Sequence, residues 1–200
     1  RSIQDVLNSD RYIKGESVSK FEFLFSNYIG TKYSVGTGNA TDAIYLSLRA
    51  LNVRAGDEVL TVSHTATGTV AAIANTGAIP VFADINRDSF TIMVEGLEKK
   101  ITNKTKAIIV VHIYGQACEM DEILYISNKY DIPVIEDCAQ ASGAEYKGKK
   151  VGSMGTIGCF SFFPTKNLSC IGDGGLVTTN SKRIENKIRS LGEYGWDKRR

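Results

Sequence analysis

Residues 158–168 have the sequence GCFSFFPTKNL, in which an aromatic run leads through Pro164 to Lys166. The aromatic residues predict a buried strand over residues 156–163. A glycine turn with the sequence GDGG follows at residues 172–175. A lysine just beyond a buried strand is usually a solvated amine. Two other stretches of the chain favour a different interpretation of this lysine.

The first of these stretches is an apolar run that ends on a carboxylate. Residues 132–137 have the sequence IPVIED, and Asp137 closes the run. A carboxylate in that place is costly unless a cation or hydrogen-bond donors satisfy it. A pyridinium nitrogen would do so, and so would backbone amides or an arginine. Gln140 lies three residues further on and would reach the phenolic oxygen of the same pyridine ring.

The second stretch is a glycine-rich turn, residues 36–42, with the sequence GTGNATD. Gly36 and Gly38 permit a tight turn, while the free amides of a helix start and the Thr41 hydroxyl suit a phosphate dianion. The alternative is an ordinary glycine turn with an Asn39 or Thr41 cap. A dinucleotide fingerprint is not satisfied, because Thr41 replaces its third glycine.

These three features together predict a pyridoxal phosphate (PLP) enzyme. A Schiff-base lysine, an acid for the pyridinium nitrogen and a phosphate cup are what this cofactor requires of a protein. Lys166 suits the chemistry because a desolvated amine can act as nucleophile and as base in turn. We also expect Ser161 to direct its hydroxyl to the same phosphate as Thr41.

Composition sets the frame for this hypothesis. Two hundred residues with 42% hydrophobic and 23% charged content predict one globular domain with a large core. The net charge of +2, from 24 basic and 22 acidic residues, is too small to predict electrostatic attraction to nucleic acid or to a membrane surface. The sequence has no apolar run of bilayer length and no signal-peptide pattern, and its cysteines are scattered. These features predict a cytoplasmic protein. The chain starts at Arg1 rather than methionine, so we expect it to be part of a longer protein.

Histidines and cysteines do not predict a metal site. The cysteines at 118, 138, 159 and 170 show no Cys-x-x-Cys spacing, and only His64 and His112 could join them. His112 lies in an apolar stretch and is interpreted as structural. For His64 three roles remain open: a contact with a planar cofactor, proton transfer, or an ordinary hydrogen-bonded structural role.

Strand and helix patterns alternate along the chain. Strands are expected over residues 32–35, 59–62, 79–85, 107–113, 132–137, 156–163 and 176–179, with helices over 1–8, 17–30, 40–51, 66–73, 94–100, 121–130 and 181–192. Alternation of this kind predicts a mostly parallel sheet covered on both faces, with ligands at the carboxyl ends of its strands. Phe21, Leu24, Phe25 and Tyr28 recur at helical spacing and are expected in the core.

Four motifs, in order along the chain, resemble the sugar aminotransferases of the DegT/DnrJ/EryC1/StrS family. They are GNATDA at 38–43, IEDCAQA at 135–141, FSFFPTKNL at 160–168 and GDGG at 172–175. The resemblance covers nearly the whole chain. It implies an α/β fold, the fold-type I aminotransferase large domain, with a mixed, mostly parallel seven-stranded sheet between helices. Residues 1–200 would be this PLP-binding domain, without the family's small C-terminal domain.

The resemblance also implies roles for individual residues. Lys166 would form the Schiff base and carry protons, and Asp137 would hold the ring nitrogen. The other expected contacts are Gln140 on the ring hydroxyl, Ser161, Ala40 and Thr41 on the phosphate, and Tyr12 reaching toward the substrate at a dimer interface. Many members place an aromatic residue over the ring where this chain has Ala66, so the stacking must come from elsewhere, and His64 is the candidate.

The activity implied is transamination of a nucleotide-linked keto sugar by a homodimer with shared sites, with L-glutamate as amino donor. The sequence HTA at 64–66 and the segment EYGWDKR at 193–199 resemble the branch that acts on dTDP-linked 3-keto-6-deoxyhexoses. Three alternatives remain. A PLP-dependent sugar dehydratase would carry histidine in place of Lys166, a regulatory protein on this fold would not need the three site residues together, and a plain structural domain would be colourless.

Overall fold

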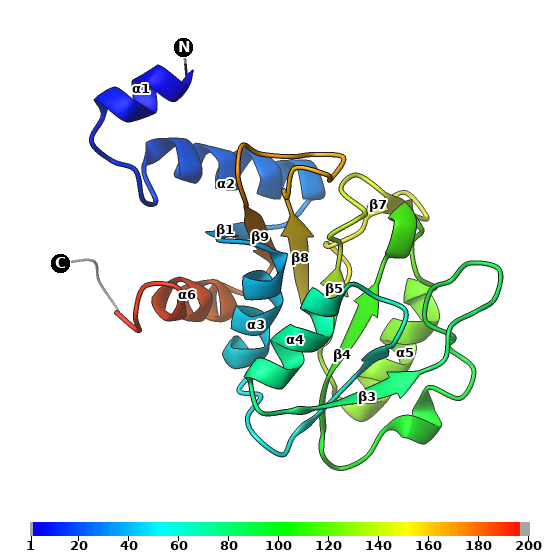
Figure 1. Cartoon of the computed structure of the whole chain (residues 1–200). Coiled ribbons are helices and arrows are strands. Elements are labelled where there is room, and N and C mark those ends of the chain that lie inside the picture. Colours follow the sequence, from blue (N-terminus) through cyan, green and yellow to red (C-terminus); the bar gives the residue numbers. More distant parts are fainter. Residues whose placement is uncertain (1, 197–200) are drawn as a thin grey trace.

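A seven-stranded mixed sheet forms the centre of the computed structural model, which describes residues 2–196 (Figure 1). Its strands, in spatial order, are β1 (Tyr33–Thr37), β9 (Gly175–Thr179), β8 (Ile157–Ser161), β5 (Val134–Asp137), β4 (Thr105–Val111), β2 (Glu58–Val62) and β3 (Ile79–Ala83). From β8 to β3 all neighbours are parallel, whereas β9 is antiparallel to both β8 and β1. The prediction of a mixed, mostly parallel sheet of seven strands is therefore confirmed.

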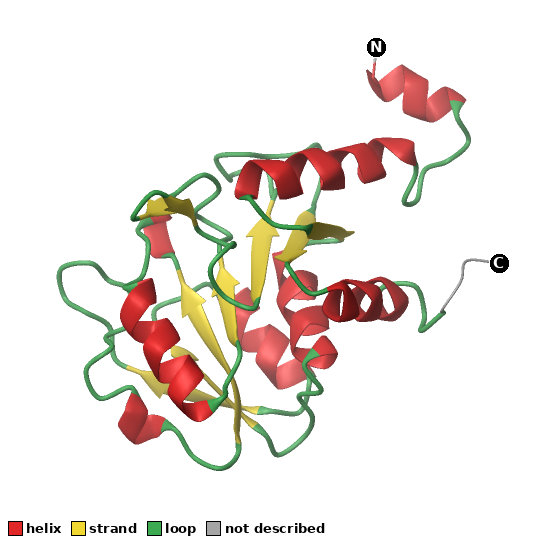
Figure 2. Cartoon of the chain, turned by 180° about the vertical axis from the view of Figure 1, so that it is seen from behind, coloured by secondary structure: helices red, strands yellow, loops and turns green. Residues whose placement is uncertain are grey.

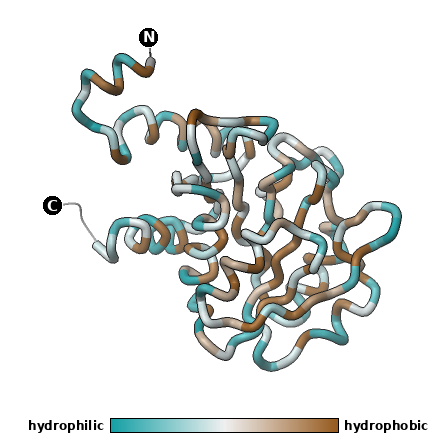
Figure 3. The backbone as a smooth tube through the Cα atoms, viewed as in Figure 1, coloured by the Kyte–Doolittle hydropathy of each residue, from teal (hydrophilic) through white to brown (hydrophobic). Residues whose placement is uncertain are grey.

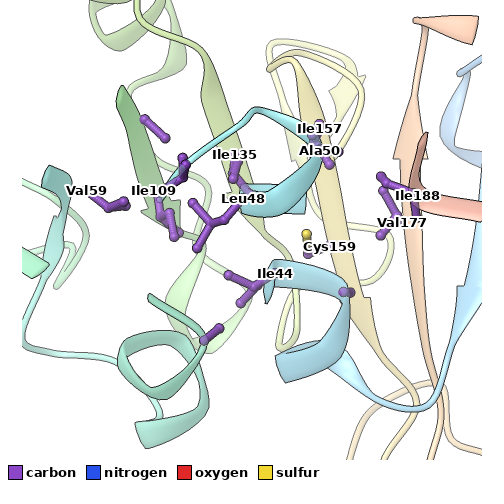
Figure 4. Packing of buried hydrophobic residues seen from close by; sticks show 14 of the residues in the cluster. Ile44, Leu48, Ala50, Val59, Ile109, Ile135, Ile157, Cys159, Val177 and Ile188 are labelled. Atoms are coloured by element: carbon purple, nitrogen blue, oxygen red, sulfur yellow. The ribbon is translucent and has the colours of Figure 1, made fainter. Parts of the chain in front are cut away.

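Helices lie on both faces of this sheet (Figure 2). The helices that cover it are α2 (Glu16–Ile29), α3 (Ala40–Ala50), α4 (Thr67–Asn75), α5 (Met120–Tyr130) and α6 (Lys182–Leu191), whereas α1 (Ser2–Asn8) lies apart from the sheet, beyond the start of α2. On one face Ile135 of β5 packs with Ile44 and Leu48 of α3 (Figure 4). On the other face its neighbour Val134 packs in the cluster that contains Ile123 of α5. Alternate strand residues thus serve separate cores.

The central strands are apolar because both of their faces are buried. Residues 107–111 of β4, with the sequence AIIVV, are each at most 6% exposed. In Figure 3 the hydrophobic colour follows such strands through the interior, and the hydrophilic colour follows the outer loops. No helix in residues 2–196 is long and apolar enough to cross a membrane.

Two local predictions were wrong. The helix α2 buries Phe25, but Phe21, Leu24 and Tyr28, which we expected in the core as well, are 38%, 54% and 52% exposed. Its outer side therefore carries apolar groups that we had expected in the core. Residues 94–100 form only a short 3₁₀ turn, η1 (Glu98–Lys100), because Gly96 at φ +83° leaves the helical region.

Parallel strands place their carboxyl ends at one edge of the sheet. His64 follows β2, Asp137 ends β5 and Ser161 ends β8, so these residues share that edge. Asp137 pairs in register with Cys159, which packs in the core beneath α3. Because Ser161 lies two residues beyond Cys159, it faces the same side of the sheet as Asp137.

Candidate active site

Asp137 is a buried carboxylate with two hydrogen-bond donors. Its side chain accepts the Thr69 hydroxyl at 2.7 Å on Oδ2 and the Ala139 amide at 3.1 Å on Oδ1. Burial raises the pKa of Asp137, while the hydrogen bonds from Thr69 and Ala139 and the charge of Lys166 oppose the shift. Asp137 has no salt bridge within residues 2–196. A buried acid of this kind suits a cationic ligand.

Lys166 lies in the loop that follows β8. Its backbone amide donates to the Phe163 carbonyl oxygen at 2.8 Å, and its side chain is partly exposed. The neighbouring Asn167 donates from Nδ2 to the Ser142 carbonyl oxygen at 2.8 Å, which ties this loop to the loop after β5. The charge of Lys166 opposes the larger effect of burial on the pKa of Asp137.

The turn before α3 presents backbone amides at the start of a helix. Asn39 caps the helix by accepting the Asp42 amide at 2.7 Å on its side chain. Within the described residues, no acceptor takes the amide hydrogens of Ala40 and Thr41. These donors lie at the positive end of an eleven-residue helix, where phosphate groups bind in many proteins.

Ser161 joins this turn through a row of paired residues. Ser161 pairs with Gly175, and Gly175 pairs on its other side with Thr37. A Cβ atom on Gly175 would lie 2.3 Å from the carbonyl carbon of Asn39, so only glycine lets the start of α3 rest against the strands. Gly175 therefore lies between Ser161 on one side and the start of α3, where Ala40 lies, on the other.

The start of α4 packs against the same turn. A Cβ atom on Gly68 would lie 2.5 Å from the Thr41 hydroxyl oxygen. Gly68 is followed by Thr69, which bonds Asp137. The first turn of α4 therefore connects the turn before α3 to the buried acid Asp137.

Gln140 and His64 are linked by a residue that sequence reasoning missed. Gln140 accepts the Tyr114 amide on Oε1 at 2.9 Å, and the Tyr114 hydroxyl lies 3.1 Å from His64 Nε2. The signal that could have found Tyr114 was its position before Gly115, just beyond the carboxyl end of β4. His64 is partly buried beside this group.

Tyr12 lies in a different environment. Its ring is 61% exposed, and its hydroxyl donates to the Leu7 carbonyl oxygen at 3.0 Å. It lines a cavity of about 770 Å³ together with Gly36 and Gly38 of the turn before α3. Within residues 2–196 no hydrogen bond joins it to Asp137 or Lys166, so its contact with substrate stays a prediction.

Glu136 and His112 form a buried polar cluster behind the site. Glu136 accepts the amides of Gly152, Met154 and Gly155 at 2.7, 2.8 and 2.6 Å, and it lies 3.1 Å from His112 Nε2. His112 Nδ1 accepts the Cys118 amide, so Nε2 is the nitrogen that donates to Glu136. Cys138 completes a set of potential metal ligands within 4.8 Å. Because Glu136 and His112 are already satisfied, the cluster holds the backbone of 152–155 in place.

Comparison with known proteins agrees with this geometry. The family model described as "DegT/DnrJ/EryC1/StrS aminotransferase family" matches residues 1–200. The chain belongs to this family. The aminotransferases of the family depend on PLP, and solved relatives include a putative sugar aminotransferase from Streptococcus pneumoniae in PLP and PMP forms.

Named relatives of the family match almost the whole chain. A dTDP-3-amino-3,6-dideoxy-alpha-D-galactopyranose transaminase from Aneurinibacillus thermoaerophilus is 45% identical, covering 100% of this chain and 55% of its own length. A UDP-2-acetamido-2-deoxy-3-oxo-D-glucuronate aminotransferase from Pseudomonas aeruginosa is 43% identical over 98% of this chain and 55% of its own. The chain thus spans about half the length of the curated relatives it matches.

The solved structures show the fold. The S. venezuelae protein DesV, determined in complex with a ketimine intermediate, has a TM-score of 0.94 and 39% identity, covering 97% of this chain and 52% of DesV. The domain therefore has the fold of the fold-type I PLP aminotransferases, as the sequence implied. Its residues fit the cofactor, because within residues 2–196 a buried carboxylate has no ionic partner and a helix start has free amides, and these match the pyridinium and phosphate groups of PLP.

Proposed function

We propose that this domain forms the cofactor-binding half of a transaminase that aminates a nucleotide-linked keto sugar. The observation that carries the proposal is Asp137, a 4% exposed carboxylate with two neutral donors and no salt bridge within the described part of the chain. PLP would supply a protonated ring nitrogen as the partner of this acid and an electron sink for the carbanion of the reaction.

Asp137 would keep the proton on the ring nitrogen, because a buried carboxylate gains most from a cation in direct contact. Gln140 would donate from Nε2 to the ring hydroxyl, since its Oε1 already accepts the Tyr114 amide. The amides of Ala40 and Thr41 would bind the phosphate at the start of α3, with the Ser161 hydroxyl on the neighbouring strand. Together these groups would orient the cofactor against the sheet edge. His64, beside Ala66, would cover the ring face.

Lys166 is the residue that would hold the cofactor aldehyde covalently through Nζ, with loss of water. As a free neutral amine, Nζ would accept the proton from the α-carbon of the amino donor, and as the ammonium it would donate this proton to the former aldehyde carbon of the cofactor. Its partly exposed position allows this movement, while Asn167 anchors the loop that carries it. Lysine rather than histidine at this position favours transamination over dehydration.

The substrates we propose are a dTDP-linked 3-keto-6-deoxyhexose and L-glutamate. Two observations support this assignment. One is the sequence HTA at 64–66, and the other is the similarity to the dTDP-3-amino-3,6-dideoxy-alpha-D-galactopyranose transaminase of Aneurinibacillus thermoaerophilus. In the segment EYGWDKR, residues 197–199 lie outside the described residues. Tyr12 would then meet the sugar in the cavity that it lines with Gly36 and Gly38.

The assembly we propose is a cytoplasmic homodimer in which residues 1–200 form the large domain and a small domain follows in the longer protein. The exposed apolar side chains of the first two helices support a partner surface, and they are Ile3, Leu7, Phe23 and Leu24. The four cysteines are free thiols, which fits a reducing compartment.

A substrate panel tests the function. The full-length protein, loaded with PLP, would be incubated with glutamate and dTDP- or UDP-linked 3-keto and 4-keto sugars, and 2-oxoglutarate and amino sugar would be measured. We expect equimolar products with one dTDP-linked 3-keto sugar. Product from a UDP-linked or 4-keto sugar alone would replace the substrate assignment, and no 2-oxoglutarate with any acceptor would argue for a regulatory protein.

A further inference from the structure

Three aromatic rings gather at the carboxyl edge of the sheet next to Gln140. They belong to His64, Phe90 and Tyr114, which follow the consecutive parallel strands β2, β3 and β4. The ring centroids of His64 and Tyr114 are 5.8 Å apart, and Phe90 lies 6.0 and 6.3 Å from them. The ring cluster therefore joins three loops beside the proposed cofactor site.

Tyr114 is held by polar bonds rather than by burial. Its side chain is 68% exposed, so packing alone does not fix it. Its amide donates to Gln140 Oε1 at 2.9 Å, and its hydroxyl lies 3.1 Å from His64 Nε2. One residue thus contacts both the group expected on the ring hydroxyl and the group expected on the ring face.

The backbone of Tyr114 is strained. Its φ of 56° and ψ of 17° lie in the left-handed region, which is uncommon for a bulky aromatic residue. A strained backbone of this kind persists only where its surroundings hold it in place. Here the left-handed turn aims the Tyr114 amide at Gln140.

This amide decides which end of Gln140 faces a ligand. A backbone N–H can only donate, so the atom that it contacts must be the carbonyl oxygen Oε1. Gln140 Nε2 has no hydrogen-bond partner within residues 2–196. The donor end of the amide is therefore left for an acceptor in the site.

We propose that Tyr114 is a positioning residue of the cofactor site. Its amide orients Gln140, and its hydroxyl holds the His64 ring in place. The inference rests on the proposed function, because Gln140 and His64 are cofactor contacts only in a PLP enzyme. It adds a residue that acts on the cofactor through its neighbours.

The test compares Tyr114→Phe with Tyr125→Phe in the full-length protein. Tyr125 is also 68% exposed, so the control removes the same hydroxyl from an equally exposed ring on α5. The dissociation constant of PLP from the apoprotein is measured by fluorescence. We expect Tyr114→Phe to weaken PLP binding about 3- to 10-fold, the value of one hydrogen bond. Tyr125→Phe should match the wild type.

A second background tests the route through His64. Combined with His64→Ala, the Tyr114→Phe change should have no further effect on PLP affinity, because the partner of the hydroxyl is gone. An equal loss in both backgrounds, or no loss in either, would overturn the positioning role.

A cofactor-free readout keeps the two proposals separate. The ¹⁵N resonances of the His64 ring, assigned with His64→Ala, should move in apo Tyr114→Phe and stay in place in Tyr125→Phe. Unmoved resonances overturn the role of Tyr114 even when PLP binds. A wild-type protein that fails to bind PLP overturns the proposed function.

Discussion

The hydroxyl of Thr69 donates to Oδ2 of Asp137 at 2.7 Å, and both groups are almost fully buried. Thr69 lies in the first turn of α4, and Asp137 is the last residue of β5. The same hydroxyl lies 2.8 Å from the hydroxyl of Thr65. A short hydroxyl chain therefore supports the acid from the side opposite to the β5 loop, and it leaves the charge of the carboxylate unmatched.

Replacing Thr69 with valine should weaken cofactor binding without changing the shape of the site. Valine matches threonine in shape but cannot donate, so the ionised form of Asp137 loses a hydrogen bond. Hydrogen bonds to charged groups contribute about 1.5–3 kcal/mol, so PLP affinity should fall about 10- to 100-fold. Equilibrium dialysis of the apoprotein measures this. Thr76→Val, at the other end of α4, is the matched control and should leave PLP affinity unchanged.

Replacing Asp137 with asparagine should stabilise the apoprotein while impairing the enzyme. Burial raises the pKa of Asp137 above its ordinary 3.8, so the contribution of Asp137 to the free energy of unfolding is fully present below pH 3.8. This contribution is lost as the pH rises through the raised pKa, because the buried carboxyl group then ionises. Asparagine does not ionise, and it can keep both contacts if Oδ1 accepts the Ala139 amide and Nδ2 donates to the Thr69 hydroxyl oxygen. The apo Asp137→Asn protein should therefore have the higher Tm, by a margin that grows from pH 4 upward and is measured by calorimetry.

Saturating PLP should reverse that order, because the wild type gains an ionic partner for its carboxylate that the variant cannot use. Equal Tm values for the two apoproteins at pH 4 and at pH 8 would mean that the buried acid carries no penalty. The proposal that it awaits a cationic ligand would then be wrong.

Lys166→Ala should abolish the visible absorbance of the lysine-bound cofactor. The wild-type protein should be yellow, and borohydride should remove the colour by reducing the bond to Nζ. Activity should fall by at least about 10²- to 10⁴-fold, the usual contribution of a proton-transfer group. Lys147→Ala, in a surface salt bridge with Asp121, is the control. A yellow Lys166→Ala protein that still reacts with borohydride would place the attachment at another amine.

The alternation of strands and helices along the chain could be predicted from the sequence because it depends on local patterns. Apolar runs over residues 132–137 and 156–163 predicted β5 and β8, and parallel pairing brings the carboxyl ends of these strands together. The exposed side of α2 could not be predicted, because helical spacing does not distinguish a core from a surface that another chain or domain covers. Tyr114 was missed because its role depends on a left-handed turn that the sequence signals only through Gly115.

Glu136→Gln should destabilise the fold strongly. The two carboxylate oxygens of Glu136 together accept four hydrogen bonds. Glutamine replaces one of these oxygens with an NH₂ group, so two of the four surrounding donors lose their acceptor. Breaking buried charged bonds of this kind costs roughly 2–5 kcal/mol. For a domain of this size that lowers Tm by about 5–15 °C, measured by calorimetry. Glu145→Gln, in an exposed pair with Lys150, should change Tm little. An unchanged Tm in Glu136→Gln would show that the cluster does not hold the 152–155 backbone.

Gly175→Ala should move the turn before α3 away from the strands. The added Cβ would lie 2.3 Å from the Asn39 carbonyl carbon, which is backbone and cannot rotate aside. Overpacking of this kind costs about 1–3 kcal/mol, and the start of α3 should shift to relieve it. Gly174→Ala is the neighbouring control, since its Cβ would lie 3.0 Å from the Sγ atom of the exposed Cys170.

The affinity for PLP compared with pyridoxal separates the turn from the rest of the site. Pyridoxal lacks the phosphate, so it does not use the amides of Ala40 and Thr41. Gly175→Ala should therefore weaken PLP binding and leave pyridoxal binding near the wild-type value, whereas Gly174→Ala should alter neither. If both ligands lost affinity equally in Gly175→Ala, the damage would have spread through the sheet, and the start of α3 would not be a separate phosphate site.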